Sequence, residues 1–153
     1  MLQNESAVRE QQTVDSIRDW FQGCPLVGNK YRFGIDYLGK NPIEYAIFMS
    51  PSNIETATDI TGETYVKPIQ ELNFAFASRE KHPADVLQAL ANYGFYDGII
   101  NWIVQQNKLK SFPEISSGKV ISIMPGLTQY LFEAEASVGR YQISCKMKYR
   151  RSI

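Results

Sequence analysis

Few residues of this chain have the types and spacing that acid–base or metal chemistry requires. The sequence contains one histidine, His82, which directly precedes Pro83 where we expect a helix to begin. A histidine at that position caps a helix or contacts solvent far more often than it catalyses a reaction. No G-x-S-x-G elbow accompanies it, and no Cys, His or acidic cluster offers it metal-ligand spacing.

Two acids near the C-terminus have a spacing that would bring their carboxylates together. Glu133 and Glu135 are two positions apart, so both lie on one face of a strand, where they could share a metal ion or a proton. A metal-dependent nuclease would need further acids that converge with them, and we identify none. Cross-strand pairing with Arg140, Lys146 or Lys148 is the more common use of such acids.

One segment, residues 23–30, has the glycine spacing of a phosphate-binding loop. Asn29 occupies the place where that motif needs lysine, and no Ser or Thr follows. The segment also follows a helix, whereas the motif needs a strand before it. We therefore expect a protein that is not an enzyme and that needs neither a cofactor nor a metal.

The strongest periodic signal is a strand at the C-terminal end of the chain. Its residues alternate with a period of two, so one face is apolar and the opposite face is basic. The apolar face carries Tyr141, Ile143, Cys145, Met147 and Tyr149. The other face carries Arg140, Gln142, Ser144, Lys146, Lys148 and Arg150.

The basic face raises the question of its partner. Beyond Gly139 the chain has five bases and no acid, but sixteen bases balance sixteen acids overall, which gives no argument for nucleic-acid binding. Its tyrosines share the apolar face, whereas stacking on single-stranded nucleic acid needs aromatics interleaved with exposed bases. We interpret this region as an assembly surface, with an ordinary solvated strand face as the alternative. The candidate assembly surface consists of Arg140, Lys146, Lys148, Arg150, Glu133 and Glu135.

The length and composition predict one globular domain over residues 1–153. Hydrophobic residues make up 44% of the chain and charged residues 21%, which is typical of a protein with a packed core. Two cysteines, Cys24 and Cys145, are too few for a disulfide framework. Residues 1–5 form a polar end without an apolar run for a signal peptide or a membrane span, so we expect synthesis in the cytoplasm.

The first half of the chain predicts a helix followed by strands. The helix covers residues 6–22 and ends at Gly23, before Cys24-Pro25. Strands are expected at 31–38 and 43–49. Residues 51–66 are polar and form either a loop or an exposed β-arm. A further strand begins after Pro68, because a proline is unfavourable inside a paired strand.

The second half predicts helices and then more strands. One helix begins at His82-Pro83 and is broken at Gly94, and a second covers 95–107. A strand at 119–124 ends at Pro125-Gly126, and a hairpin over 130–151 turns at 137–139. Because strands and helices occur in runs, we expect an α+β fold: a largely antiparallel sheet with the helices packed on one face.

Several segments together resemble a family of phage proteins. They are Asp19-Trp20-Phe21, Cys24-Pro25-Leu26, Ile35-Asp36-Tyr37-Leu38-Gly39, Phe74-Ala75-Phe76-Ala77-Ser78-Arg79-Glu80, Gly94-Phe95-Tyr96 with Trp102, Tyr130-Leu131-Phe132-Glu133-Ala134 and Arg140-Tyr141-Gln142-Ile143. In order and spacing they resemble the small minor capsid or tail-completion proteins encoded in tail-assembly regions of phages and prophages of Gram-positive bacteria. The resemblance runs from about Asp19 to Tyr149.

This resemblance implies a structural role in a virion and no catalytic residues. Proteins of this kind resemble tail terminators, which form a hexameric ring at the head-proximal end of the tail tube, stop its polymerisation and join it to the head. The implied partners are further copies of the chain, the tail tube protein and head–tail connector or neck proteins. DNA passes only as cargo through the channel, and no membrane is involved. The alternatives are a head–tail connector (stopper or neck) ring and a nucleic-acid-binding module that uses Arg140, Lys146, Lys148 and Arg150.

Overall fold

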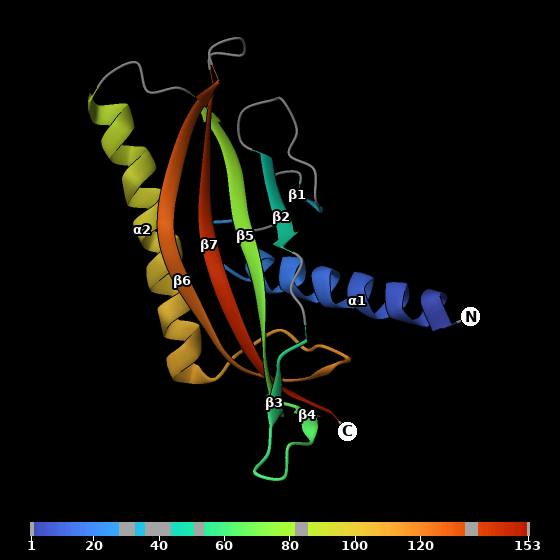
Figure 1. Ribbon diagram of the computed structural model, residues 1–153. Coiled ribbons are helices and arrows are strands. Elements are labelled where there is room, and N and C mark those ends of the chain that lie inside the picture. The colour runs from blue at the N-terminus through green and yellow to red at the C-terminus, as the bar shows by residue number, and fades with distance from the viewer. Residues whose placement is uncertain are drawn as a thin grey trace.

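A computed structural model describes residues 2–27, 33–35, 44–50, 54–81, 86–133 and 138–152 (Figure 1). It contains two helices and seven strands in these residues. Their bounds are α1 Leu2–Gln22, β1 Phe33–Ile35, β2 Glu44–Ser50, β3 Thr56–Thr58, β4 Thr64–Val66, β5 Ile69–Lys81, α2 Val86–Leu109, β6 Gly118–Glu133 and β7 Val138–Arg151. Neither helix is long and apolar enough to cross a bilayer, as far as the described residues show.

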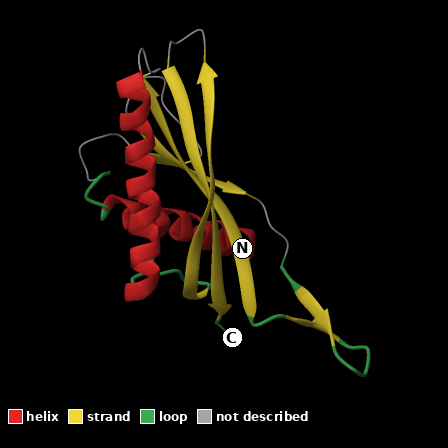
Figure 2. Cartoon of the chain, turned by 90° about the vertical axis from the view of Figure 1, so that its left-hand side faces the viewer, coloured by secondary structure: helices red, strands yellow, loops and turns green. Residues whose placement is uncertain are grey.

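Five of the strands form one sheet in the order β1-β2-β5-β7-β6, and β3 pairs with β4 in a separate ribbon. All neighbours in the large sheet are antiparallel except β1 and β2, which are parallel. Helix α2 runs along the sheet, whereas α1 crosses it (Figures 1 and 2). The expected α+β fold with a largely antiparallel sheet is confirmed.

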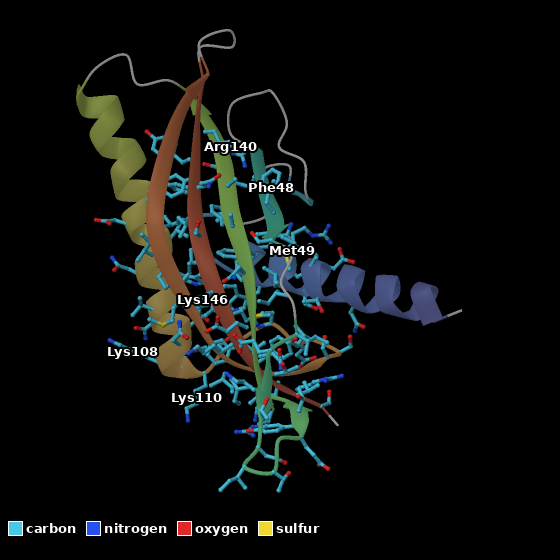
Figure 3. The ribbon with its side chains drawn as sticks, viewed as in Figure 1. Phe48, Met49, Lys108, Lys110, Arg140 and Lys146 are labelled. Carbon is cyan, nitrogen blue, oxygen red and sulfur yellow. The ribbon has the colours of Figure 1, made fainter. Side chains whose placement is uncertain are left out.

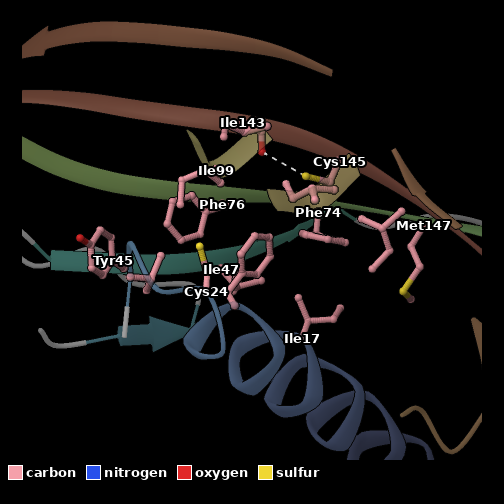
Figure 4. Close-up of a cluster of buried hydrophobic side chains, with 14 of the residues drawn as sticks. Ile17, Cys24, Tyr45, Ile47, Phe74, Phe76, Ile99, Ile143, Cys145 and Met147 are labelled. Carbon is pink, nitrogen blue, oxygen red and sulfur yellow. Dashed lines mark hydrogen bonds between the residues drawn. The ribbon is translucent and has the colours of Figure 1, made fainter. Parts of the chain in front are cut away.

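The core lies between the sheet and the two helices (Figure 4). Helix α1 contributes Ile17 and Phe21, both with no exposed surface, and the aromatic ring of Phe21 stacks on that of Phe76 in β5 at 4.9 Å between centroids. Helix α2 adds Ile99 and Ile103, which are also fully buried. Full burial of a side chain of this size contributes about 1.5–3 kcal/mol. Both helices therefore cover the same face of the sheet.

Helix α2 continues through Gly94, so the predicted break at this residue is wrong. Among the described glycines only Gly62 has a positive φ, so Gly94 lacks the left-handed backbone of a helix C-terminus. Beyond it, Tyr96, Ile99 and Ile103 are buried at helical spacing. Their packing outweighs the cost of an interior glycine, about 0.5–1 kcal/mol. The predicted start at His82-Pro83 lies outside the described residues.

Strand β6 continues through Pro125-Gly126, so the predicted strand end there is also wrong. Its pairing with β7 shifts register between Val120 and Ser122 and again between Pro125 and Thr128. Because β6 is an edge strand, a proline at such an irregularity removes no hydrogen bond to a second neighbour. The β6–β7 hairpin therefore stays one long ribbon, bent at two points.

The starts of α1 and β7 also differ from those expected. Helix α1 begins at Leu2, so residues 2–5 belong to it. Strand β7 begins at Val138, so Val138 and Gly139 lie in the strand and not in the hairpin loop, whose residues 134–137 are outside the described part. Of the strand expected at 31–38, the described residues are those of β1. The described part of 51–66 forms the β3–β4 ribbon, which makes it a β-arm.

Candidate assembly surface

The face of the sheet opposite the helices carries the predicted basic residues. In β7, Tyr141, Ile143 and Met147 are at most 2% exposed, whereas Lys146 and Lys148, from the alternating set, are exposed. The period of two in the sequence therefore assigned these side chains of β7 to the correct faces. We call the exposed side of β5, β6 and β7 the outer face.

Glu71 of β5 lies between two of the lysines. Its carboxylate oxygens are 3.9 Å from Nζ of Lys146 and 3.8 Å from Nζ of Lys148. The lysine side chains are half exposed, and exposed pairs contribute about 0.2–1 kcal/mol. Sequence analysis missed Glu71, although it lies on the polar face of a strand whose other face carries Leu72 and Phe74. Its approach to the lysines depends on β5 pairing with β7, which no local pattern reveals.

Of the two predicted acids, only Glu133 lies within the described residues, and it does not pair with a base. Glu133 is paired with Val138, whereas Lys146 faces Met124 and Lys148 faces Ser122. The register therefore places neither lysine across from Glu133. Glu135 lies outside the described residues.

Arg140 lies apart from the lysines, near Phe48 of β2 (Figure 3). Its guanidinium carbon is 4.6 Å from the centre of the Phe48 ring. Phe48 packs on Ala46 and Ala77, which have no exposed surface although they lie on the outer face. A cation over a ring contributes about 0.5–2 kcal/mol, depending on how far it is desolvated. The structure thus divides the predicted bases into Arg140 at one end and the lysines with Arg150 at the other.

Strand β6 extends the outer face with residues that sequence analysis did not single out. Lys119 pairs with Arg150 in register, and Met124 pairs with Lys146, so these side chains share the outer face. Lys119 is exposed, Met124 is 55% exposed, and Ile121 at the first register shift is 44% exposed. We define the basic patch as Lys119, Lys146, Lys148 and Arg150.

The β-arm, residues 54–68, leaves the end of β5 and projects beyond the sheet (Figures 1 and 2). Gln70, which is 2% exposed, holds its base. The Gln70 amide nitrogen donates to the carbonyl oxygens of Glu55 at 3.0 Å and Lys67 at 2.7 Å. Its amide oxygen accepts from the Glu55 N–H at 2.8 Å. The buried side-chain amide of Gln70 therefore joins both segments of the arm, at Glu55 and at Lys67, to the sheet.

The tip of the arm is built around Asp59. Its carboxylate accepts the backbone N–H groups of Thr61 at 2.9 Å and Glu63 at 3.0 Å and the Thr61 hydroxyl at 2.6 Å. These hydrogen bonds lower the pKa of Asp59, and the bond from the Thr61 hydroxyl has the largest effect. Gly62 takes the positive φ of 88° that closes the turn. The tip is thus ordered by its own hydrogen bonds without help from the core.

The arm carries four large apolar side chains that are exposed to solvent. Ile60 at the tip is 103% exposed, and Ile54, Tyr65 and Val66 are 60%, 50% and 40% exposed. Isolated exposed apolar residues are ordinary, but four on one arm outside the core are a concentration typical of an interaction surface.

Chemically reactive groups are buried or dispersed in the described part of the chain. No three His, Cys, Asp or Glu residues among those described come close enough to hold a metal ion. Cys24 and Cys145 are free thiols inside the core (Figure 4). Burial raises the pKa of both, that of Cys145 to about 12.

This chain is similar to known proteins in structure and not in sequence. No family model matches this chain, and no curated protein matches it. Among solved structures, a chain from the virion of a native gene transfer agent particle is similar, with a TM-score of 0.49 and 13% identity. The match covers 91% of this chain and 93% of the other.

Proposed function

We propose that this chain is a structural protein of a phage or prophage virion and acts as a tail terminator. Copies of it form a ring, with a hexamer as the expected size, at the head-proximal end of the tail tube. The ring stops tube polymerisation and presents a surface to head–tail connector or neck proteins. The β-arm is the observation that carries this proposal, because an ordered extension with exposed apolar side chains outside the core serves a subunit that must contact other chains.

The segments that resemble tail-completion proteins supply the fold of the proposed ring subunit. Phe21, Phe76, Tyr96 and Ile143, one from each of four such segments, are all buried in the core. The resemblance is therefore carried by residues that position the helices on the sheet. The β-arm lies outside these segments, so it supports the proposal independently.

The role needs no catalytic residue, and we propose that the chain is not an enzyme. It terminates a polymer by binding its end, which requires complementary surfaces and no bond chemistry. The channel of such a ring lets DNA pass as cargo.

Electron microscopy of the intact particle tests this proposal. We expect the chain as a ring between the tail tube and the head. In solution, mass photometry of the purified full chain should detect rings, alone or with tail tube protein. A chain that stays monomeric and never binds tube ends would contradict the proposal, and a ring on the head side of the neck would replace it with the connector alternative.

The basic patch favours DNA binding as a second candidate function. Four bases lie together, with Glu71 as the acid that pairs with two of them. If the patch binds phosphates, the logarithm of the affinity should fall linearly with the logarithm of salt concentration, with a slope that counts the contacts. No binding of duplex DNA at low salt would dismiss this function.

A further inference from the structure

We infer that the β-arm of one copy docks on the basic patch of a neighbouring copy, with the arm tip against the exposed apolar residues of β6. This inference rests on the proposed ring and deepens it by naming the two surfaces that meet between subunits. The occupant of the patch is a second copy of this chain, and three observations favour it.

The first observation is charge complementarity. The arm contains three acids, Glu55, Asp59 and Glu63, and one base, Lys67, a net charge of −2. The outer face around the patch has four bases and one acid, Glu71, a net charge of +3. Opposite potentials on two surfaces steer association and fix which surfaces meet.

The second observation is that each surface has exposed apolar side chains beside its charges. On the arm, Ile60 is fully exposed and Tyr65 is half exposed. On β6, Ile121 and Met124 are 44% and 55% exposed, and Met124 lies opposite Lys146. Removing this apolar area from water contributes about 25 cal/mol per Å², which charge pairing alone does not supply.

The third observation is geometric. The three side-chain hydrogen bonds of Gln70, which we call the Gln70 clamp, hold the arm so that it projects beyond the end of the sheet (Figures 1 and 2). Among the described residues no ion pair joins an acid of the arm to a base of the patch. Because arm and patch are different surfaces, copies can join head-to-tail through them, and such contacts close into rings when the rotation permits.

The arm is also prepared for binding before it meets a partner. The Asp59 turn and the Gln70 clamp order its tip and its base within one chain. Docking therefore requires little further ordering of the backbone, which lowers the entropic cost of association.

A charge-swap experiment on the full chain tests the inference. Glu55→Lys with Glu63→Lys makes the arm basic, and Lys119→Glu with Arg150→Glu makes the patch acidic while leaving the Glu71 pairs in place. These four side chains are exposed, so the fold should tolerate the changes. We expect each double variant to weaken self-association at least tenfold, and the quadruple variant to recover it. Asp97→Lys, at an exposed position of α2, is the control and should associate normally.

An uncharged variant separates docking from general electrostatics. Ile60→Ser should weaken self-association at least fivefold and leave the melting temperature unchanged, whereas Val104→Ser on the exposed side of α2 should change neither. Rings that form equally well with every arm and patch variant overturn the inference and leave the tail terminator proposal standing. A closed dimer as the largest species overturns head-to-tail docking. A chain that never self-associates overturns the inference, and it overturns the proposed function only if tail tube ends also fail to bind it.

Discussion

At the scale of single residues, Gln70 is the side chain on which the arm depends most. Gln70 is a buried polar residue, and its side-chain amide makes three hydrogen bonds to the two segments that form the base of the arm, at Glu55 and Lys67. A buried amide with all its partners present is stable, whereas loss of one partner leaves a buried carbonyl unsatisfied.

Gln70→Glu removes both donors and keeps the shape of the side chain. The carbonyl oxygens of Glu55 and Lys67 then lose the N–H groups that they accept. We expect the free energy of unfolding to fall by about 1–3 kcal/mol and amide exchange over residues 54–68 to accelerate. Denaturant unfolding and hydrogen exchange measure these effects. Unchanged exchange in the arm would show that it is held by other contacts.

The raised pKa of Cys145 predicts how the stability of the protein depends on pH. Burial raises the pKa of its thiol from 9.0 to about 12. In that interval the unfolded chain has lost the thiol proton and the folded protein retains it, so high pH favours unfolding. The contribution of Cys145 to stability is complete below pH 9 and is lost as the pH rises toward 12.

Comparison with Cys145→Ala isolates this thiol from other groups that titrate at high pH. We expect the stability of the native sequence to decline more steeply above pH 9 than that of the variant, by about 1.4 kcal/mol per pH unit. Chemical denaturation at a series of pH values gives both slopes. Parallel slopes would mean that the thiolate forms without unfolding.

At the scale of elements, residue patterns identified faces more reliably than ends. The alternation in β7 placed Met147 inward and Lys146 outward because the period of a strand leaves no other choice. Gly94 and Pro125 indicated ends, but packing of α2 on the sheet and the edge position of β6 allowed both elements to continue. Glu71 could not be assigned to the lysines because strand order depends on contacts far apart in the chain.

Gly94→Ala tests the continuity of α2. A Cβ at this position would have no heavy atom within 4 Å outside the helix's own nearby backbone. Alanine in an exposed helix interior is more favourable than glycine by about 0.5–1 kcal/mol. We therefore expect a rise in stability of that size, measured by denaturant unfolding. A helix broken at Gly94 with left-handed backbone would instead lose stability on this change.

Gly118→Ala is expected to have the opposite effect. A Cβ there would lie 2.0 Å from the carbonyl oxygen of Arg150, so the start of β6 would have to move away from β7. We expect a loss of roughly 1–3 kcal/mol, the usual range for overpacking. A thermal melt of this variant beside Gly94→Ala compares the two glycines directly, and equal melting temperatures would contradict at least one of the two assignments.

At the scale of the whole molecule, the chain divides into a core that folds it and extensions available for contact. Most of the buried residues come from α1, the turn after it, α2 and the inner face of the large sheet, whereas β3 and β4 contribute none. A subunit built this way can change its contacts without changing its fold, which is useful for a protein that must meet several partners in one assembly.

Replacement of residues 56–66 by Asn-Gly tests this division. The Lys67 N–H already donates to the carbonyl oxygen of Glu55 at 3.0 Å, so a two-residue turn can close the shortened hairpin. Because the removed residues are almost all exposed and loop length has a weak effect on stability, we expect the free energy of unfolding to change by less than about 1 kcal/mol. Mass photometry of the same protein should show monomers where the native chain forms rings. Loss of the fold would make the arm part of the core, and persistent rings would place the subunit contacts on the sheet and helices alone.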